Sequence, residues 1–519
     1  MRDRWLLVSV FAGGVTTLAV ELSASRLLGN VFGTSNIVWA NIIGLILIYL
    51  TVGYFLGGRW ADRSPHRHTF YRILAWGAFT AGLVPIAARP VLGRAVAAFA
   101  QFDAAILAGS FLAVLVLFSL PVTLLGCISP FAIRLAMQER EQAGRVSGLI
   151  YAISTLGSIV GTFVPVLWLI PVLGTAQTFL AFSLGLQLVA LIGLYLTSGL
   201  SSLLRLLWMP FLTVVLSWLS LAGPIKDSPN AIFETESAYN YIQVQEVEGI
   251  RLLYLNEGLA EHSIYSVAQQ GPVYGYGTWE YFLAAPFFNA PPAGMQSVRS
   301  LGLIGLAAGT IAKQYTQVFG PIPIDGWEID PEIVRVGRQF FGMSEPNLNA
   351  VVADGRWGLS QSNRRYDVIA VDAYRVPYIP WQLMTREFFQ EVKDHLQPEG
   401  VLAVNVGRTP DDRRLIEAVV GTLSAVFPSV HLVDVPDTFN SLVYATARPT
   451  RPENLVANLL ALQAEQAPTE LVQVLDRTIA NLQPTPASEV VFTDDRAPAE
   501  QLVNSILIQF IFAGMPGLR

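Results

Sequence analysis

Three acidic residues in the C-terminal half of this 519-residue chain each stand at the end of a predicted strand. Glu328 ends Pro323-Ile-Asp-Gly-Trp-Glu328, Asp354 follows Ala350-Val-Val-Ala, and Asp372 follows Val368-Ile-Ala-Val. Parallel strands bring their carboxyl ends to one edge of a sheet, where open α/β sheets bind ligands. A carboxylate at that edge can bind both hydroxyls of a ribose, hydrogen-bond an exocyclic amine or accept a proton. The pattern predicts one site containing all three.

A small-residue turn precedes these acids and indicates what the site binds. Gly305 and Gly309 follow the first apolar run and open a helix, and Glu328 comes 23 residues after Gly305. Gly-x-x-x-Gly is not the full dinucleotide fingerprint, so the turn alone is a weak signal. Together with the three acids, it predicts a nucleoside-containing cofactor. Asp354-Gly355 favours the adenine site of S-adenosylmethionine-type enzymes over a nicotinamide dinucleotide.

The elements that position these residues alternate between strand and helix. Five strands are predicted, ending near residues 305, 328, 354, 372 and 405, with helices between them. This rhythm is typical of a parallel, doubly wound sheet, and we assign residues 296–450 to a Rossmann-like domain. Residues 223–295 are predicted to form a β-rich lobe, with a hairpin turning at Glu248-Gly249. Residues 451–519 are predicted to form a C-terminal helical extension.

The first 222 residues have a different composition. They contain 13 arginines, no lysine and 6 acids (net +7), whereas residues 223–519 carry 20 basic and 33 acidic residues (net −13). About 20 apolar residues are needed to cross a bilayer as a helix. Seven runs approach that length: 5–28, 36–58, 71–88, 104–127, 146–171, 175–197 and 203–222. We therefore expect a polytopic, helical membrane domain with six or seven spans.

Arginine placement predicts the orientation of this domain. Arginines cluster before the first run, after the second and after the fourth, which places those ends in the cytoplasm. Seven crossings would then leave the C-terminal half outside, where a nucleoside cofactor is not normally available. We expect a cell (inner) membrane protein with a cytoplasmic C-terminal domain. This expectation conflicts with a count of seven crossings, and the conflict stays open.

Composition excludes several classes of function. The acidic C-terminal half argues against nucleic-acid binding, which needs a basic surface. Cys127 is the one cysteine, so no intrachain disulfide or cysteine metal cluster can form. The histidines lack metal-ligand spacing, and we expect no metal.

Several motifs of this chain resemble those of the spermidine synthase (polyamine aminopropyltransferase) family, and more closely those of its membrane-fused members. The motifs that carry this resemblance are Glu236-Ser-Ala-Tyr239, Leu255-Asn-Glu-Gly258, Glu261-His-Ser-Ile-Tyr265, Ile304-Gly305 to Thr310, Glu328-Ile-Asp-Pro331, Asp354-Gly-Arg356, Tyr366 to Asp372, Leu383-Met-Thr-Arg-Glu387, and also Glu21 to Arg26, Gly148 to Ser158 and Thr493 to Pro498. They cover nearly the whole chain in order. The resemblance implies a methyltransferase-type Rossmann-like fold.

The resemblance also implies roles for individual residues. Glu328 binds the ribose, Asp354 and Gly355 contact the adenine, and Asp372 is the catalytic acid that receives or orients the amine proton. The family reaction moves an aminopropyl group from the co-substrate decarboxylated S-adenosylmethionine to a diamine such as putrescine. Spermidine and methylthioadenosine are the products, and the family implies self-association into a homo-oligomer.

The chain departs from the family in the amine pocket. Asn240 replaces a glutamine, Ala308 an acid of the glycine-rich turn, Trp279 a histidine and Arg375 a second aspartate. Arg375 would repel a diammonium substrate. The candidates left to bind the amine are Asn240, Glu280 and Tyr374, with Glu257, Glu261 and Tyr265 as further acidic or aromatic side chains.

Three functions remain open. The first is a membrane-anchored aminopropyltransferase acting on a small-molecule diamine. The second is an S-adenosylmethionine-dependent methyltransferase, for which Arg375 would meet an anionic or membrane-associated acceptor. The third is a transporter or sensor with a degenerate synthase domain, a reading favoured by intramembrane Glu21 and Arg26 and by Gly57 to Arg63, which is similar to a loop of major facilitator transporters. Each has the lipid bilayer as a partner.

Overall fold

The computed structural model describes residues 2–32, 36–99, 105–137, 143–221, 230–256, 260–373 and 379–512. The chain divides into two compact units. The helical unit comprises residues 1–229 and 234–241, and the α/β unit comprises residues 230–233 and 242–519.

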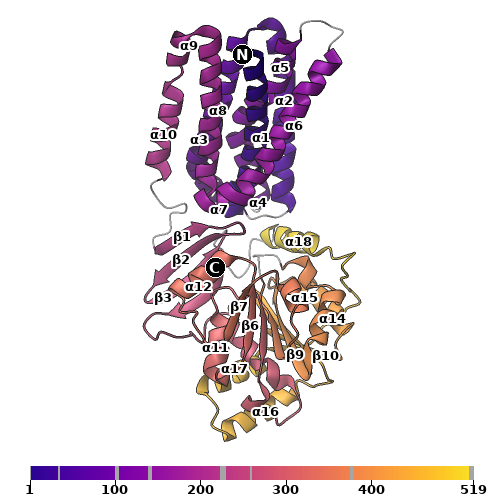
Figure 1. Ribbon diagram of the computed structural model, residues 1–519. Coiled ribbons are helices and arrows are strands. Elements are labelled where there is room, and N and C mark those ends of the chain that lie inside the picture. Colours follow the sequence, from indigo (N-terminus) through magenta and orange to yellow (C-terminus); the bar gives the residue numbers. More distant parts are fainter. Residues whose placement is uncertain are drawn as a thin grey trace. The chain divides into compact units, whose positions relative to one another are not determined.

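Long apolar helices build the helical unit (Figure 1). They are α1 (Arg2–Phe32), α2 (Asn36–Arg63), α3 (Arg67–Phe99), α4 (Ala105–Gly126), α5 (Ile128–Ala136), α6 (Ala143–Val164), α7 (Ile170–Leu173), α8 (Thr175–Ser198), α9 (Leu200–Leu204) and α10 (Trp208–Leu221). A π-helical turn, Pro165–Leu169, joins α6 to α7. Among the described residues, seven segments are long and apolar enough to cross a membrane. Each overlaps one of the seven predicted runs.

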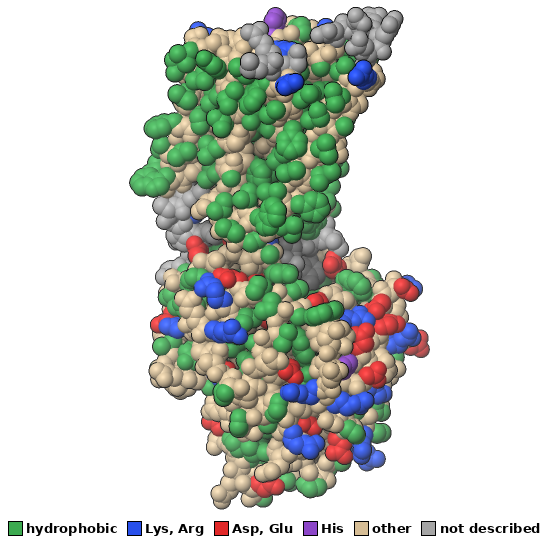
Figure 2. Space-filling model, in the orientation of Figure 1, with side chains coloured by type: hydrophobic (Ala, Val, Ile, Leu, Met, Phe, Trp, Pro, Cys, Tyr) green, Lys and Arg blue, Asp and Glu red, His purple; other side chains and the backbone are tan. Residues whose placement is uncertain are grey.

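The surface of this unit is apolar, as a lipid-facing surface must be. Phe55, Val172 and Trp218 each expose at least two thirds of their area. Figure 2 shows hydrophobic side chains spread over the visible face of these helices. An exposed surface of this kind is costly in water and favourable in hydrocarbon. The helical unit therefore fits a membrane protein.

Small residues let the first and sixth helices approach closely. A Cβ atom added to Gly157 would lie 2.2 Å from the carbonyl oxygen of Phe11, and one added to Gly161 would lie 2.1 Å from that of Val15. Such contacts replace the hydrophobic effect as the source of helix association in lipid. They explain the glycines in the predicted spans at 5–28 and 146–171.

A small antiparallel sheet follows the helices in the sequence. Its order is β1-β2-β3-β4, with β1 Ala231–Glu236, β2 Tyr241–Val247, β3 Ile250–Leu255 and β4 Glu261–Ser266. Glu248 and Gly249 turn the predicted hairpin with positive φ angles of 51° and 78°. Two consecutive residues with positive φ match the right-handed twist of paired strands.

The large sheet has eight strands in the order β12-β10-β11-β9-β8-β5-β6-β7. Their bounds are β5 Leu301–Ile304, β6 Ile324–Glu328, β7 Leu348–Val352, β8 Tyr366–Val371, β9 Leu396–Gly407, β10 Ser429–Asp434, β11 Asn440–Thr446 and β12 Leu482–Gln483. Strands β9, β8, β5, β6 and β7 are parallel. These are the five predicted strands, and the Rossmann-like fold class is confirmed. Three antiparallel strands extend the sheet beyond them.

Helices cover both faces of this sheet (Figure 1). They are α11 (Thr310–Phe319), α12 (Pro331–Phe340), α13 (Gly355–Ser360), α14 (Arg386–Asp394), α15 (Arg414–Ser424), α16 (Glu453–Ala464), α17 (Thr469–Ala480) and α18 (Ala499–Phe512). One apolar core packs α11, α16, α17 and the 3-10 helix Trp279–Phe288 on the sheet, and the other packs α14 and α15. The chain adds β6 and β7 on one side of β5 and then returns to add β8 on the other side. The adjacent strands β5 and β8 therefore flank the topological switch point, where such sheets bind ligands.

Candidate functional site

The turn after β5 lies directly against the end of β8. Gly305 has a φ of +88°, and a Cβ atom there would be 2.5 Å from the carbonyl oxygen of Asp372. The Asp372 N–H donates to the Ile304 carbonyl at 2.9 Å. Any side chain at 305 would therefore push the two strand ends apart, which is why this position is glycine. Gly309, with a φ of +90°, ends the turn and precedes α11.

Glu328, the last residue of β6, faces this turn. One of its oxygens, Oε2, accepts the Ala307 N–H at 2.9 Å, and Oε1 accepts the Asp330 N–H at 3.1 Å. The side chain is buried, and desolvation raises the pKa of its carboxyl to about 7 despite these two donors. A carboxylate held at this point is suited to the hydroxyls of a ribose.

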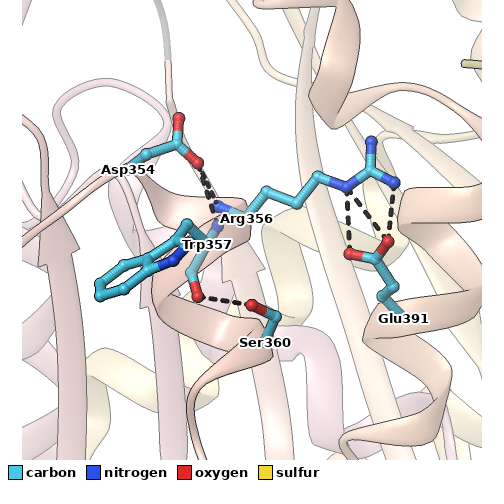
Figure 3. A pocket seen from close by; sticks show the side chains of 5 residues that line it. All are labelled: Asp354, Arg356, Trp357, Ser360 and Glu391. Atoms are coloured by element: carbon cyan, nitrogen blue, oxygen red, sulfur yellow. Dashed lines mark hydrogen bonds and ion pairs between the residues drawn. The ribbon is translucent and has the colours of Figure 1, made fainter.

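Asp354 and Gly355 follow β7 and begin α13. Asp354 Oδ1 accepts the N–H groups of Arg356 and Trp357, both at 3.0 Å, while its other oxygen points away from the helix (Figure 3). A Cβ atom on Gly355 would lie 2.4 Å from Ile304 Cγ2, so a side chain there would collide with β5. The pair thus lies close to the glycine turn, and one carboxylate oxygen remains available to a ligand.

A pocket opens beside Asp354. It is lined by Asp354, Arg356, Trp357, Ser360 and Glu391 (Figure 3). Arg356 is held between two acids, with Nη2 2.7 Å from Glu391 Oε1 and Nη1 2.8 Å from Asp494 Oδ1. Asp494, from the Thr493 to Pro498 motif, therefore supports the wall of the pocket through this arginine.

Asp372 lies one residue beyond β8, at the switch point. Its Oδ1 accepts a hydrogen bond of 2.9 Å from Nδ2 of Asn405, near the end of β9. Desolvation raises the pKa of the Asp372 carboxyl to about 6, and the Asn405 donor opposes that rise. Such a carboxylate is ionised at neutral pH and can accept a proton.

Sequence reasoning missed Asn405. The fifth predicted strand ends in Val401-Leu-Ala-Val-Asn405, so a polar residue does follow a buried run there. The rule that identified the three acids therefore also applied to this amide.

Glu280, predicted to bind the amine, is engaged by the protein itself. Its Oε1 accepts from Arg477 Nη2 at 2.9 Å, and its Oε2 accepts the Gly275 N–H at 2.6 Å. The side chain is 2% exposed. The carboxylate therefore fixes the loop at Gly275 and pairs with a cation, and its role toward substrate stays a prediction.

Asn240 belongs to the helical unit and lies in the turn between β1 and β2. Its N–H donates to Ser237 Oγ at 2.9 Å. Within the same unit, Arg26 Nη2 donates to the Ser237 carbonyl at 2.8 Å, and Glu236 Oε2 accepts the Thr175 N–H at 2.6 Å. Arg26, near the end of the first predicted span, thus holds this turn. Tyr374, Arg375 and Glu257 lie outside the described residues.

Ala308 and Trp279, two of the positions that depart from the family pattern, lie in apolar surroundings. The Ala308 methyl group packs in an apolar cluster with Ile333, Val336 and Phe341, where an acid would be desolvated without a partner. Trp279 is buried in the core. Neither position offers a charge to an amine.

A different acid lies near the glycine turn. Glu261, on β4, accepts hydrogen bonds from Tyr254 Oη at 2.8 Å and Tyr276 Oη at 3.4 Å. Two residues along the strand, Ser263 Oγ accepts the Ala308 N–H at 3.0 Å, so β4 contacts the turn itself. Among the described residues, no group of three histidine, cysteine or acidic side chains could hold a metal ion.

The α/β unit is similar to known proteins. Residues 321–453 match the spermine/spermidine synthase domain. A probable polyamine aminopropyl transferase of Bifidobacterium longum is 32% identical over 298 residues, 54% of this chain and 64% of that protein. The polyamine aminopropyltransferase of Vibrio vulnificus is 29% identical over 40% of this chain and 68% of its own length. The human eEF1A lysine and N-terminal methyltransferase is 29% identical over 32% of this chain and 25% of its own length.

Solved structures of similar chains include a probable spermidine synthase from Corynebacterium glutamicum (18% identity, TM-score 0.39, 50% of this chain and 99% of that one). A spermidine synthase in complex with the transition state analogue AdoDATO has 18% identity and a TM-score of 0.39, covering 49% of this chain and 86% of that one. The chain spans just under two thirds of the Bifidobacterium relative. The domain match and these relatives support a similarity of this part of the chain to the spermidine synthase family.

Proposed function

We propose that this protein is a membrane-anchored polyamine aminopropyltransferase. Its substrates would be decarboxylated S-adenosylmethionine and a diamine such as putrescine, and its products spermidine and methylthioadenosine. The observation that carries this proposal is the position of Asp372, a proton acceptor at the switch point, beside the turn that Glu328 faces. The match of residues 321–453 to the spermine/spermidine synthase domain and the similarity to aminopropyltransferases support the same reaction.

Each side chain has a part in the proposed reaction. Glu328 binds the ribose hydroxyls, the free oxygen of Asp354 accepts from the adenine amine, and Gly305, Gly309 and Gly355 leave room for the nucleoside. The neutral amine attacks the aminopropyl carbon beside the sulfonium. The new N–C bond forms as the C–S bond breaks, sulfur keeps the electron pair, and the proton of the amine passes to Asp372.

The product assay tests this proposal. The full-length protein in detergent receives putrescine and decarboxylated S-adenosylmethionine, and methylthioadenosine is measured. We expect its release together with spermidine. If no methylthioadenosine forms, the proposal is wrong.

A methyltransferase is the second candidate, and one observation favours it. The apolar surroundings of Ala308 remove an acid from the region where the family binds its amine, and the methyltransferase relative shows that similar sequences occur in that class. S-adenosylhomocysteine released from S-adenosylmethionine and a membrane extract would support it.

We also propose that the helical unit anchors the protein in the cell membrane, with the α/β unit in the cytoplasm, where nucleoside co-substrates are made. Seven apolar segments support the anchor. Self-association, implied by the resemblance, is part of the same proposal and can be measured by light scattering of the detergent-solubilised protein.

A further inference from the structure

Asn405 and Asp372 occupy equivalent places on neighbouring strands. Val404 of β9 pairs with Val371 of β8 in the parallel ladder, so Asn405 and Asp372 are the next residue on each strand. Val371 and Val404 both point into the same apolar core. Because successive side chains alternate between faces, Asn405 and Asp372 both project to the opposite face.

The orientation of the Asn405 amide follows from its neighbour. An ionised carboxylate accepts hydrogen bonds and donates none, so the group that faces Asp372 Oδ1 at 2.9 Å must be the amide nitrogen. The flipped amide would place two acceptors against each other.

This orientation leaves the other half of the amide without a partner. Asn405 is 6% exposed, and its carbonyl oxygen Oδ1 accepts no hydrogen bond from any residue that the structure describes. Buried carbonyl groups are nearly always paired, because an unpaired one loses its bond to water without compensation. An unpaired acceptor beside the proposed base points to a ligand that donates.

We propose that Asn405 and Asp372 together bind the attacking amine and select a primary amine. This inference rests on the proposed function and deepens it. A neutral primary amine has two N–H groups and one lone pair. Asp372 accepts one N–H and takes its proton, Asn405 Oδ1 accepts the second N–H, and the lone pair is left to form the N–C bond as the C–S bond breaks and sulfur keeps its electrons.

Asp372 and Asn405 favour an amine that has two N–H groups, one for each acceptor. A secondary amine has one N–H, and if Asp372 uses it, Asn405 Oδ1 stays unpaired. Sites built to hydrogen-bond a group reject analogues that lack it, because the protein partner is then left buried and unsatisfied.

The test compares Asn405→Leu with the wild type, using putrescine and N,N′-dimethylputrescine as acceptors for decarboxylated S-adenosylmethionine. Leucine has a similar volume and neither donor nor acceptor. We expect the preference in kcat/KM for putrescine over its dimethyl analogue to fall about 10-fold or more. The acid limb of the putrescine pH profile should move to higher pH because Asp372 loses its donor. The affinity for methylthioadenosine should stay within about two-fold of that of the wild type.

Asn347→Leu is the matched control. Asn347 also donates through Nδ2, to Thr316 and the Ile322 carbonyl, and its Oδ1 is also unpartnered within the described residues, but it precedes β7 at the opposite edge of the sheet. It should change neither the preference nor the pH profile. An unchanged preference and acid limb in Asn405→Leu would overturn the inference alone, as would equal shifts in Asn347→Leu. A wild type that makes no methylthioadenosine overturns the proposed function as well.

Discussion

At the scale of single residues, the account depends on Asp372 as the proton acceptor. Replacing its carboxylate by an amide in Asp372→Asn removes the base and keeps the shape. We expect kcat to fall about 100- to 10,000-fold, the usual contribution of general base catalysis. Methylthioadenosine binding, measured by calorimetry, should change by no more than about three-fold.

The control for this variant is Asp394→Asn, which removes an exposed carboxylate at the end of α14. Its kcat should equal that of the wild type. Full activity in Asp372→Asn would remove that residue from the mechanism.

The raised pKa of Asp372 predicts the pH dependence of the reaction. A base must be ionised to accept a proton, so kcat at saturating putrescine should fall as pH drops through a pKa of about 6. Steady-state rates between pH 5 and 8 measure this limb. A flat profile would show that no carboxyl with this pKa acts as the base.

The raised pKa of Glu328 predicts a change in stability. Its pKa is about 7 when folded and about 4.3 when unfolded, so the folded state holds the extra proton between these values. The ligand-free protein should therefore lose stability as pH rises from about 4.3 to 7, by up to about 1.4 kcal/mol per pH unit from this group.

Glu328→Gln tests this linkage. The variant cannot titrate at this position, so its melting temperature should fall less steeply than that of the wild type over the same pH range. Parallel curves would contradict the burial of the Glu328 carboxyl in an apolar environment.

At the scale of secondary structure elements, the site depends on how closely the β5 turn approaches the end of β8. Gly305→Ala combines a positive φ with a contact of 2.5 Å to the Asp372 carbonyl. Gly320→Ala is a matched control, since Gly320 has a φ of +79° and nothing within 4 Å of an added Cβ. The control should cost about 1–3 kcal/mol from its backbone conformation alone.

Gly305→Ala should lose more, lowering the melting temperature further and weakening methylthioadenosine binding at least about 10-fold, because the strand ends must separate. Equal melting temperatures for the two variants would show that the close approach is unimportant.

The elements that form the site could be predicted because a glycine or a polar residue stands at or just after the end of each parallel strand, and β5, β8 and β9 also contain buried apolar runs. The antiparallel strands β10 and β11 contain similar short apolar runs and were missed, and the two residues of β12 are too few to recognise. The segment Trp279–Phe288, within the predicted β-rich lobe, forms a buried 3-10 helix. Its continuous apolar pattern does not distinguish the two structures. The sequence rule applied to Asn405 as well, but only the strand register shows that it lies beside Asp372.

At the scale of the whole molecule, two expectations about topology conflict. If all seven segments cross the membrane in succession, the start of the first and the ends of the second and fourth share one side, and most arginines of the helical unit belong to that side. The positive-inside rule assigns that side to the cytoplasm and residues after the seventh segment to the other side. The proposed co-substrate requires the opposite.

We predict that the co-substrate requirement holds and that the C-terminus is cytoplasmic. A C-terminal green fluorescent protein fusion should fluoresce in cells, while an alkaline phosphatase fusion at the same position should be inactive. The reverse pattern would place the α/β unit outside and would contradict a cytoplasmic nucleoside co-substrate.

The central claim is that this site transfers an aminopropyl group. The most direct measurement offers the full-length protein equal concentrations of decarboxylated S-adenosylmethionine and S-adenosylmethionine together with putrescine, and identifies the nucleoside released. The account predicts methylthioadenosine, formed with spermidine and lost in Asp372→Asn. Release of S-adenosylhomocysteine with a methylated amine, or of neither nucleoside, would contradict it.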